Sequence, residues 1–233
     1  MKMHEHIKFN GTVLDNFLAQ GCYRMRQDIF TTGFICDSHN IYNVFWLRFR
    51  LTHFYFDKKP QRLLATNNSF KIATRSFSIN KEIEELYKLY LDKVNFDAPP
   101  TLQDFLSGET FTGDLHSNLF DSEIIELRDN GKLIAAGIYD KGSVAIAGIM
   151  NFYDPAYGKY SLGKYLMLLK MQLAIERNMQ LYYPGYIAYR CNKFDYKLFP
   201  NPHFAEIFDS KKKLWLPYSK ELLFQLAEDP GDY

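Results

Sequence analysis

The second half of this chain contains a series of expected strands that limits the possible folds more than any other feature. Residues 123–129 and 132–139 are separated by Asn130-Gly131, a pair typical of the type I′ turn, and they predict a β-hairpin. Asp140-Lys141-Gly142 turns the chain again, and the apolar residues 143–153 predict a third strand. Strands joined by such short turns pair antiparallel in one sheet.

A helix and a further strand follow these three strands. We expect the helix from Leu162 to about Arg177, with Ser161 as its cap, and the strand at 180–187. Three antiparallel strands, a helix and another strand form an order that resembles the core of the acetyltransferase-like (GNAT) fold. The resemblance implies an α+β protein with a GNAT-like mixed sheet flanked by helices.

The loop before this helix differs from that of GNAT proteins that use acetyl-CoA. In those proteins a glycine-rich loop presents its amides to a pyrophosphate. This chain reads YGKYSLGKYL, in which Gly158 and Gly163 are too far apart to form the same cradle. The difference argues against acetyl-CoA, and we predict no cofactor.

The beginning of the chain predicts a short helix and a long strand. Residues 12–20 read as an amphipathic helix with Thr12 as a possible cap and Gly21 at its end. Alternation over Val44–Leu51 predicts a strand that places Arg48 and Arg50 on the same face. Paired arginines on a strand usually form a solvated face, and that alternative stays open here.

Residues 81–95 predict a helix whose apolar stripe includes Ile83, Leu86 and Tyr87, and Asn80 is at its N-cap position. One more short helix is expected at 101–107. We therefore divide the chain into a smaller N-terminal α/β half, residues 1–78, and a GNAT-like C-terminal domain, residues 79–233.

The segment Leu181–Pro200 combines aromatic and basic residues. Seven of its side chains are aromatic, and cations such as Lys193 and Lys197 lie between them. This mixture suits stacking on a base or ribose together with pairing to phosphate or carboxylate. Pro184 and Gly185 interrupt the expected strand, which is typical of a place where a ligand or another backbone lies close.

The order of residues within this segment resembles the signature of the aminoacyl-tRNA protein transferases, the arginyl- and leucyl-transferring enzymes of N-terminal degradation tagging. The matching positions are Gly185, Tyr186, Cys191, Lys193, Phe194, Tyr196, Lys197 and Phe199-Pro200. A second part of the signature lies about one helix upstream, at Tyr153-Asp154-Pro155 and Ser161-Leu162-Gly163. Both parts occur in the order found in that family.

Earlier segments resemble the same family more weakly. Gly21, Tyr23 and Arg24 fit its N-terminal opening, and Arg48 or Arg50 fits its arginine-bearing strand. Residues 54–72 resemble its basic connector, where the matching positions are Phe56, Lys58, Lys59, Gln61, Arg62 and Asn67. Arg62 is a candidate for binding an anion, because a guanidinium offers a planar fork to phosphate or carboxylate.

The cysteine cluster of metal-binding family members is missing. Cys22 and Cys36 are separated by thirteen residues, and Cys191 lies far from both. A tetrahedral metal site needs about four ligands, and adding His39 or His53 gives no compact spacing. We predict no metal, and free thiols in a reducing compartment.

Charge is distributed unevenly although the formal net charge is only +1. Residues 22–75 carry nine Lys/Arg against three Asp/Glu, and 185–220 carry seven against three, whereas 81–140 carry five against thirteen. If the two basic segments fold together they would form one positive face for a polyanion such as tRNA. The N-terminus has no apolar signal core and no membrane span is expected, so the sequence predicts a cytoplasmic protein, which we expect to be a monomer.

The resemblance implies transfer of an arginyl or leucyl group from aminoacyl-tRNA to the N-terminal α-amine of acceptor proteins that begin with Asp or Glu, which tags them for degradation. Because the donor ester is already activated, such an enzyme mainly orients the reactants and stabilises the oxyanion. The candidate catalytic residues are Asp154, Tyr186 and Lys197. The candidate substrate-binding residues are Arg24, Arg48, Arg62, Tyr153, Ser161, Leu162, Gly163, Tyr183, Gly185, Lys193 and Tyr196.

Two other functions remain open at the level of sequence. One is an N-acyltransferase that uses acyl-CoA. The other is a protein that binds tRNA or a degradation signal without turnover, which the missing cysteines would favour. The role of Asp154 also stays open, since an Asp-Pro turn leading into a helix would explain it without catalysis.

Overall fold

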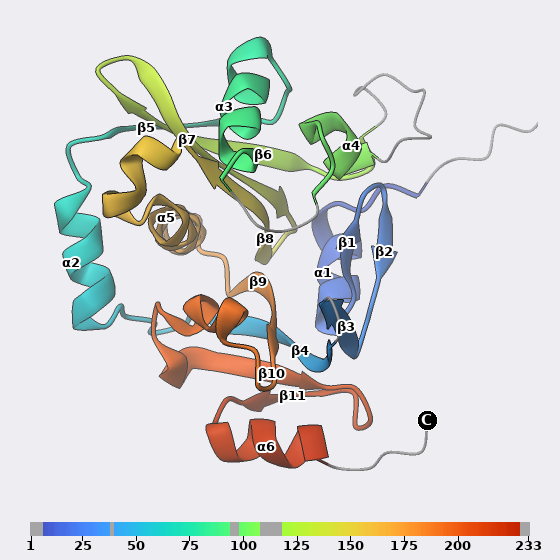
Figure 1. Ribbon diagram of the computed structural model, residues 1–233. Helices are drawn as coiled ribbons and strands as arrows, with labels where there is room; N and C mark the ends of the chain where they lie inside the picture. The colour runs from blue at the N-terminus through green and yellow to red at the C-terminus, as the bar shows by residue number, and fades with distance from the viewer. Residues whose placement is uncertain (1–6, 38–39, 94–97, 108–117, 229–233) are drawn as a thin grey trace, which may run out of the picture.

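The computed structural model describes residues 7–37, 40–93, 98–107 and 118–228. A nine-stranded mixed sheet crosses the molecule in the order β11-β10-β4-β9-β8-β7-β6-β5, and β3 pairs with the free half of β4 (Figure 1). Its strands are β3 (Phe34–Asp37), β4 (Asn40–Arg50), β5 (Lys71–Ser76), β6 (Ser122–Asp129), β7 (Lys132–Lys141), β8 (Ala145–Tyr153), β9 (Leu181–Ala188), β10 (Ala205–Asp209) and β11 (Leu214–Pro217). β1 (Tyr23–Met25) and β2 (Asp28–Phe30) form a separate hairpin.

Helices cover both faces of the sheet (Figure 1). The α-helices are α1 (Gly11–Ala19), α2 (Lys58–Thr66), α3 (Lys81–Leu91), α4 (Leu102–Ser107), α5 (Leu162–Glu176) and α6 (Lys220–Glu228). Short 3-10 helices occur at η2 (Pro155–Tyr160), η3 (Asn192–Leu198) and η4 (Pro202–Phe204). On one face, α5 packs into the largest apolar cluster together with side chains of α2 and α6. On the other face, α3 and α4 cover β6–β8, and α1 lies beside the β1–β2 hairpin.

The order of elements expected for residues 123–187 is confirmed. β6, β7 and β8 pair antiparallel, α5 follows, and β9 returns parallel to β8. The turn at Asn130 and Gly131 has positive φ at both residues, 48° and 88°, as a type I′ turn requires. The prediction of an α+β fold with a large mixed sheet flanked by helices is therefore correct.

Several predicted boundaries need correction. α1 begins at Gly11 after Asn10, so Thr12 lies inside the helix and is not its cap. Ser161 has a left-handed backbone (φ 50°, ψ 45°) and makes no side-chain cap to α5, because it forms the turn between η2 and α5. α3 ends at Leu91, and residues 94–95 of the predicted helix lie outside the described residues. Asn80 does cap α3, and its side-chain oxygen accepts from the Ile83 amide at 2.9 Å.

α2 differs from the sequence expectation of a basic connector at residues 54–72. The expectation of a connector rested on the charged residues around Pro60. A proline is nevertheless tolerated in the first turn of a helix, because its backbone nitrogen needs no hydrogen-bond partner there. The buried side chain of Asn67 then holds the end of α2 against the other half of the chain, donating to the Tyr160 carbonyl at 2.9 Å.

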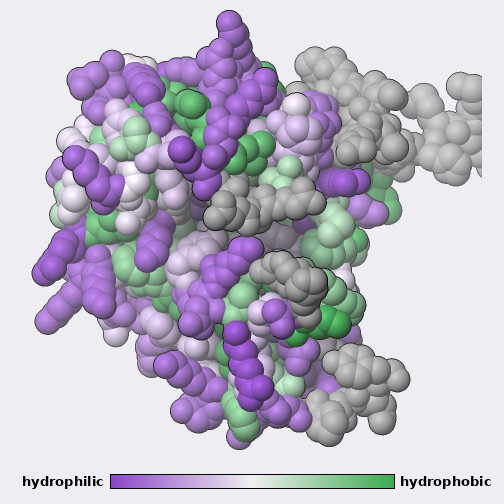
Figure 2. Space-filling view, viewed as in Figure 1, coloured by the Kyte–Doolittle hydropathy of each residue, from purple (hydrophilic) through white to green (hydrophobic). Residues whose placement is uncertain are grey.

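Strands from both halves of the chain share the large sheet. β4 pairs with β9 and β10, and β5 pairs with β6, so the expected division at residue 78 crosses one continuous sheet. That division stays a prediction. None of the described helices is long and apolar enough to cross a membrane. Figure 2 shows hydrophilic side chains over much of the face seen in Figure 1, with smaller apolar patches between them.

Candidate active site

A groove opens where β8 and β9 separate. The two strands pair only between residues 145–147 and 181–183. Beyond this point Gly148 and Ile149 of β8, and Pro184 of β9, line two neighbouring cavities of about 140 and 480 Å³. A third cavity, of about 360 Å³, lies near the start of α5 and shares Asn151 and Tyr196 with the first. These three cavities form the candidate site.

The hydroxyl group of Tyr23 lies at the point where the strands separate. Its oxygen is 2.6 Å from the carbonyl oxygen of Tyr183 on β9 and 2.9 Å from that of Gly148 on β8. The Tyr23 ring stacks on Trp46 with 4.9 Å between centroids. A buried tyrosine of the N-terminal hairpin thus brings one hydroxyl donor to two backbone carbonyl oxygens at the point where strand pairing ends, and they share its single proton.

Pro184 and Gly185 do not end β9, which continues to Ala188. They instead coincide with an irregular register between β9 and β4, and Gly185 has φ 101°, a conformation that side chains other than glycine rarely adopt. A Cβ atom at Gly185 would lie 3.1 Å from the Lys197 amine. The predicted close approach at this glycine is therefore made by a lysine of the same chain.

Lys197 is the central cation of the groove. Its side chain extends from η3, lines both the 140 Å³ and the 480 Å³ cavities, and donates to the Tyr186 carbonyl oxygen at 2.8 Å. The amine also lies 4.7 and 5.0 Å from the ring centroids of Tyr186 and Phe194. Burial lowers the Lys197 pKa to about 7, because the charged form loses its hydration.

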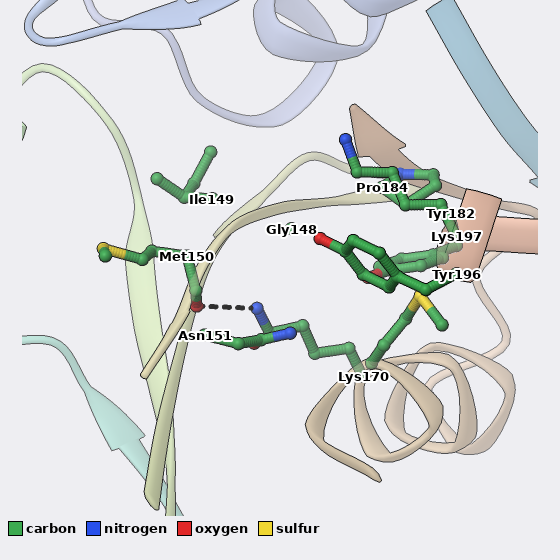
Figure 3. A pocket seen from close by; sticks show the side chains of 10 residues that line it. Gly148, Ile149, Met150, Asn151, Lys170, Tyr182, Pro184, Tyr196 and Lys197 are labelled. Carbon is green, nitrogen blue, oxygen red and sulfur yellow. Dashed lines mark hydrogen bonds between the residues drawn. The ribbon is translucent and has the colours of Figure 1, made fainter. Parts of the chain in front are cut away.

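A second buried lysine and an asparagine, both missed by the sequence analysis, line the smallest cavity (Figure 3). Lys170 of α5 donates to the carbonyl oxygens of Ile138 at 2.6 Å and Met150 at 3.2 Å. Burial lowers its pKa to about 7, although the charge of Asp140 partly opposes the shift. Asn151 donates to the Gly163 carbonyl at 3.0 Å, and its buried Oδ1 has no hydrogen-bond partner. The sequence does contain a signal that could have identified Lys170, because a lysine stands there among the apolar residues of the expected helix.

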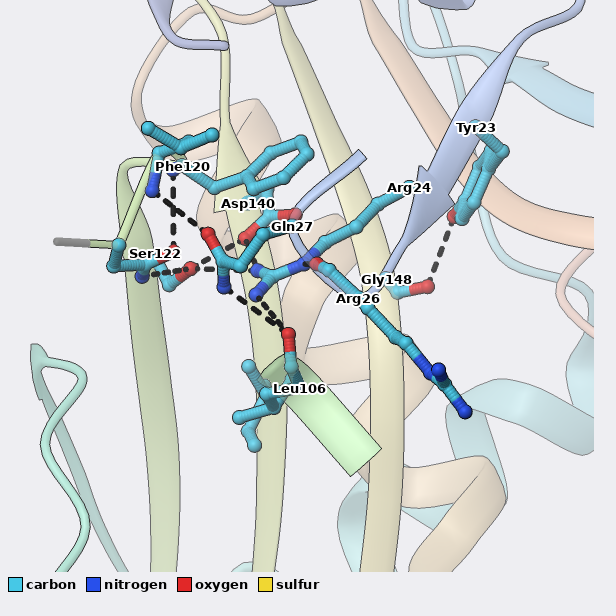
Figure 4. Close-up of polar contacts among 12 residues, drawn as sticks. Tyr23, Arg24, Arg26, Gln27, Leu106, Phe120, Ser122, Asp140 and Gly148 are labelled. Atoms are coloured by element: carbon cyan, nitrogen blue, oxygen red, sulfur yellow. Dashed lines mark hydrogen bonds and ion pairs between the residues drawn. The ribbon is translucent and has the colours of Figure 1, made fainter. Parts of the chain in front are cut away.

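Arg24 is held inside the protein. Its guanidinium pairs with Asp140 at 2.9 Å and donates to Ser122 Oγ at 3.1 Å (Figure 4). It also lies over the Phe120 ring, 4.3 Å from the centroid. Arg24 borders the 480 Å³ cavity, but its charge is already matched by a buried carboxylate.

Arg48 and Tyr183 lie together outside the three cavities. Arg48 pairs with Glu206 of β10 at 2.6 Å and stacks on Trp215 at 4.5 Å from the ring centroid. Arg50 pairs with the other oxygen of Glu206, also at 2.6 Å. The buried Tyr183 hydroxyl accepts from Arg48 at 3.5 Å. The two arginines do lie side by side, as predicted, and share a carboxylate; the Arg50 side chain is 65% exposed, whereas that of Arg48 is 14% exposed.

The upstream part of the signature lines the third cavity. Tyr153, Ser161, Gly163 and Tyr196 surround it together with Tyr90 and Lys164, which the sequence analysis did not select. Leu162 is fully buried in the main core and supports α5 from inside. The two parts of the signature, separated by a helix in sequence, thus meet at one cavity because β9 returns beside β8.

Besides Arg48, Tyr183 and Leu162, three more predicted residues lie outside all three cavities. Asp154 pairs with Lys132 at 2.6 Å and accepts from the Ala156 amide at 2.9 Å, as an Asp-Pro turn would. Burial raises its pKa, but these hydrogen bonds outweigh burial and leave the pKa below its usual value. Arg62 is exposed on α2, and Lys193 is exposed on η3 beside Phe194. Catalysis by Asp154 and anion binding by Arg62 and Lys193 stay predictions.

No group of three or more His, Cys, Asp or Glu that could hold a metal ion is present within the described residues. The three cysteines are free thiols. None of the described residues lining the three cavities is Asp or Glu. The site therefore offers amines, hydroxyls, amides and aromatic rings as its functional groups.

A family model described as the C terminus of arginine-tRNA-protein transferase matches residues 82–205, which is more than half of the chain. The chain belongs to this family. The match includes β6–β9, α5, η3 and every described residue of the 140 Å³ cavity. The resemblance that the signature residues indicated is therefore confirmed.

Relatives of this transferase family are similar over different lengths. An aspartate/glutamate leucyltransferase of Hahella chejuensis is 29% identical over 143 residues, covering 60% of this chain and 58% of the relative. One from Aeromonas hydrophila is 25% identical over 202 residues, covering 85% and 80%. Arginyl-tRNA--protein transferase 1 of Arabidopsis thaliana is 27% identical over 186 residues, covering 69% and 28%. The alignments span about three fifths of the Hahella relative and 63% of a similar Pseudomonas fluorescens protein.

Two solved structures show partial similarity. FemX superposes with a TM-score of 0.48 at 9% identity, covering 78% of this chain and 61% of FemX. The C-terminal domain of a putative lysylphosphatidylglycerol synthetase from Agrobacterium fabrum gives a TM-score of 0.46 at 12% identity, covering 63% and 49%.

Proposed function

We propose that this protein transfers an aminoacyl group from aminoacyl-tRNA to the N-terminal α-amine of an acceptor protein. The observation that carries the proposal is the Lys197 amine, buried where β8 and β9 separate and lowered in pKa to about 7. A lysine that is partly neutral near pH 7 can accept a proton, and the open cavities on both sides leave space for two reactants.

The proposed reaction needs one proton acceptor and a fixed geometry. The neutral α-amine attacks the ester carbonyl carbon, the carbonyl oxygen becomes an oxyanion, and the bond to the 3′ oxygen of the terminal adenosine then breaks. Lys197 takes the proton that the attacking nitrogen loses and returns it to the departing 3′ oxygen. The products are an amide and a free hydroxyl group, and the reaction releases the proton that the acceptor ammonium lost before attack.

The aromatic cavity beside α5 suits the donor end of tRNA. Tyr153, Tyr196 and Tyr90 offer rings for stacking, and Lys164 offers a charge to a phosphate. The smaller cavity next to it, which Asn151 and Tyr196 also line, would hold the aminoacyl side chain. The acceptor would enter through the 480 Å³ cavity, where Tyr186 and Gly185 lie beside Lys197.

The names of the relatives support a proposal for the donor amino acid and for the first residue of the acceptor. The relatives from Hahella and Aeromonas are called aspartate/glutamate leucyltransferases, and the one from Arabidopsis is called an arginyl-tRNA--protein transferase. We propose that this chain likewise modifies acceptors that begin with Asp or Glu, with a leucyl or arginyl donor, and that the product is a degradation tag. Action as a cytoplasmic monomer is part of the same proposal.

The test is incubation of the protein with tRNAs charged with labelled leucine or arginine and peptides that begin with Asp, Glu or Asn. Mass spectrometry should show one added aminoacyl group on the peptide N-terminus. Lys197→Met should lower the rate at pH 7 by about a hundredfold or more, within the range of general-base catalysis. Lys88→Met, on the exposed face of α3, is the matched control. A parent protein that modifies no peptide would refute the proposed function.

A further inference from the structure

Arg26 lies at the tip of the β1–β2 hairpin in a conformation that is unusual for its residue type. Its φ is 58°, in the left-handed region that arginine rarely adopts outside tight turns. The Arg26 carbonyl oxygen accepts from Arg24 Nε at 2.6 Å, and Arg24 is itself fixed by the buried Asp140. The core therefore determines where Arg26 is placed.

The side chain of Arg26 is exposed and points away from the Arg24–Asp140 cluster (Figure 4). It lines the 480 Å³ cavity together with several aromatic side chains, which include Trp46, Phe30 and Tyr186. Within the part of the chain that the structure describes, this guanidinium has no hydrogen bond or ion pair. A cation in a cavity without a described carboxylate has its full charge available to an anionic ligand.

Other cations near the cavity are already engaged. Arg24 is matched by Asp140, and Arg48 by Glu206. Lys197 donates to the Tyr186 carbonyl and is the group that the proposed reaction uses. Among the described residues that line the cavity, Arg26 is therefore the cation that remains for the acceptor side chain.

We propose that Arg26 binds the side-chain carboxylate of the acceptor's first residue and so determines the preference for Asp or Glu. This inference rests on the proposed function, because it assigns an N-terminal residue to the 480 Å³ cavity. Arg26 and Lys197 line the same cavity, so the α-amine can face Lys197 while the carboxylate of the same residue faces Arg26. Arg24, predicted from sequence to touch substrate, then acts as a positioning residue for Arg26.

The experiment compares two peptides that differ only in a first residue of Asp or Asn, with three variants at position 26. Arg26→Gln removes the charge, Arg26→Lys keeps it, and Arg26→Gly removes the charge while suiting the left-handed backbone. Arg190→Gln is the control for residue type and backbone, since Arg190 also has a positive φ, 59°, but lies outside the three cavities. The measured quantity is the ratio of kcat/KM for the Asp peptide to that for the Asn peptide.

We expect Arg26→Gln and Arg26→Gly to lower this ratio about tenfold or more, as loss of a charge-assisted contact would. Arg26→Lys should retain most of the preference, and Arg190→Gln should leave the ratio unchanged. An unchanged ratio in Arg26→Gln would overturn the inference. Equal loss with both peptides, together with weaker tRNA binding, would also overturn it, since Arg26 would then contact a tRNA phosphate.

Peptide binding is measured separately, by fluorescence anisotropy without tRNA, so that the inference is tested even if no transfer occurs. The parent should bind the Asp peptide more tightly than the Asn peptide, and Arg26→Gln should remove the difference. Absence of transfer with this binding pattern would refute the proposed function and keep the carboxylate site. Transfer to Asp and Asn peptides at equal rates would support the proposed aminoacyl transfer and refute the carboxylate site.

Discussion

Two buried lysines, Lys170 and Lys197, line the same small cavity, and each has a pKa lowered to about 7 by burial. In the unfolded chain both would titrate near pH 10.4. Between these values the unfolded state binds protons that the folded state does not. The free energy of unfolding should therefore rise with pH above 7, because a lowered lysine pKa penalises the folded state at low pH.

This linkage gives a prediction for Lys197→Met. Each lysine contributes at most about 1.4 kcal/mol per pH unit to the slope of unfolding free energy. The variant removes one of the two groups, so the slope between pH 7.5 and 9 should fall by roughly half. Urea unfolding at several pH values measures it. An unchanged slope would show that the Lys197 amine stays charged in the folded protein.

The buried ion pair of Arg24 and Asp140 gives a prediction about the stability of the folded protein. Both are buried, and Arg24 pairs with Asp140 Oδ1 while Oδ2 has no hydrogen-bond partner. Arg24→Met would leave the carboxylate without its cation, with the Ser122 hydroxyl, 2.6 Å from Oδ1, still donating to it. We expect a loss of about 3 to 5 kcal/mol of stability. Replacing both residues, as in Arg24→Met with Asp140→Leu, should recover much of it. Arg26→Gln should cost about 0.5 kcal/mol or less, since its side chain is exposed. Equal destabilisation by the Arg24 and Arg26 variants would contradict this assignment.

At the scale of elements, the site depends on how far β8 and β9 stay paired. The Tyr23 hydroxyl donates its single proton to the carbonyl oxygens of Gly148 and Tyr183, which share it where the pairing ends. Tyr23→Phe keeps the stack on Trp46 but leaves these carbonyls without their donor. The expected cost is about 1 to 3 kcal/mol, together with faster amide hydrogen exchange in β9. Phe30→Leu, in the neighbouring strand β2, is a control that deletes no hydrogen bond. Unchanged exchange in Tyr23→Phe would show that the hydroxyl does not hold the strands.

The elements around the groove could be predicted from sequence because their signals are local. The Asn130-Gly131 turn, the apolar residues 143–153 and the stripe of α3 each lie within one short window. The groove itself could not, since it results from the end of pairing at Tyr183 and from contacts between distant residues. Arg24 and Asp140 are 116 positions apart. Arg26, at a hairpin tip, has no neighbouring pattern that would distinguish it from a solvated arginine.

At the scale of the molecule, the two basic segments meet along part of their length, and one positive face for tRNA stays a prediction. β4 belongs to the first segment, and it pairs with β10 and with the end of β9, which lie in the second. Sheet pairing therefore places residues 40–50 of the first segment beside the second, whereas β5, at the end of the first segment, lies at the opposite edge of the sheet and pairs with β6. Several cations in these segments already have carboxylate partners, including Arg48 and Arg50, so only the remaining ones are available to tRNA.

Salt dependence measures how many of these cations meet phosphate. Each neutralised phosphate adds about 0.9 to the slope of log affinity against log salt, so four contacts would lower tRNA affinity roughly a hundredfold between 50 and 200 mM salt. Lys213→Gln, in the exposed turn before β11, should lower the slope by about 0.9, whereas Lys88→Gln, on α3 in the acidic region, should leave it unchanged. Filter binding with charged and uncharged tRNA gives both slopes. A change of less than threefold over this range would exclude the basic face as a tRNA surface and favour a small acyl donor, because a donor such as acyl-CoA meets far fewer cations than a tRNA does.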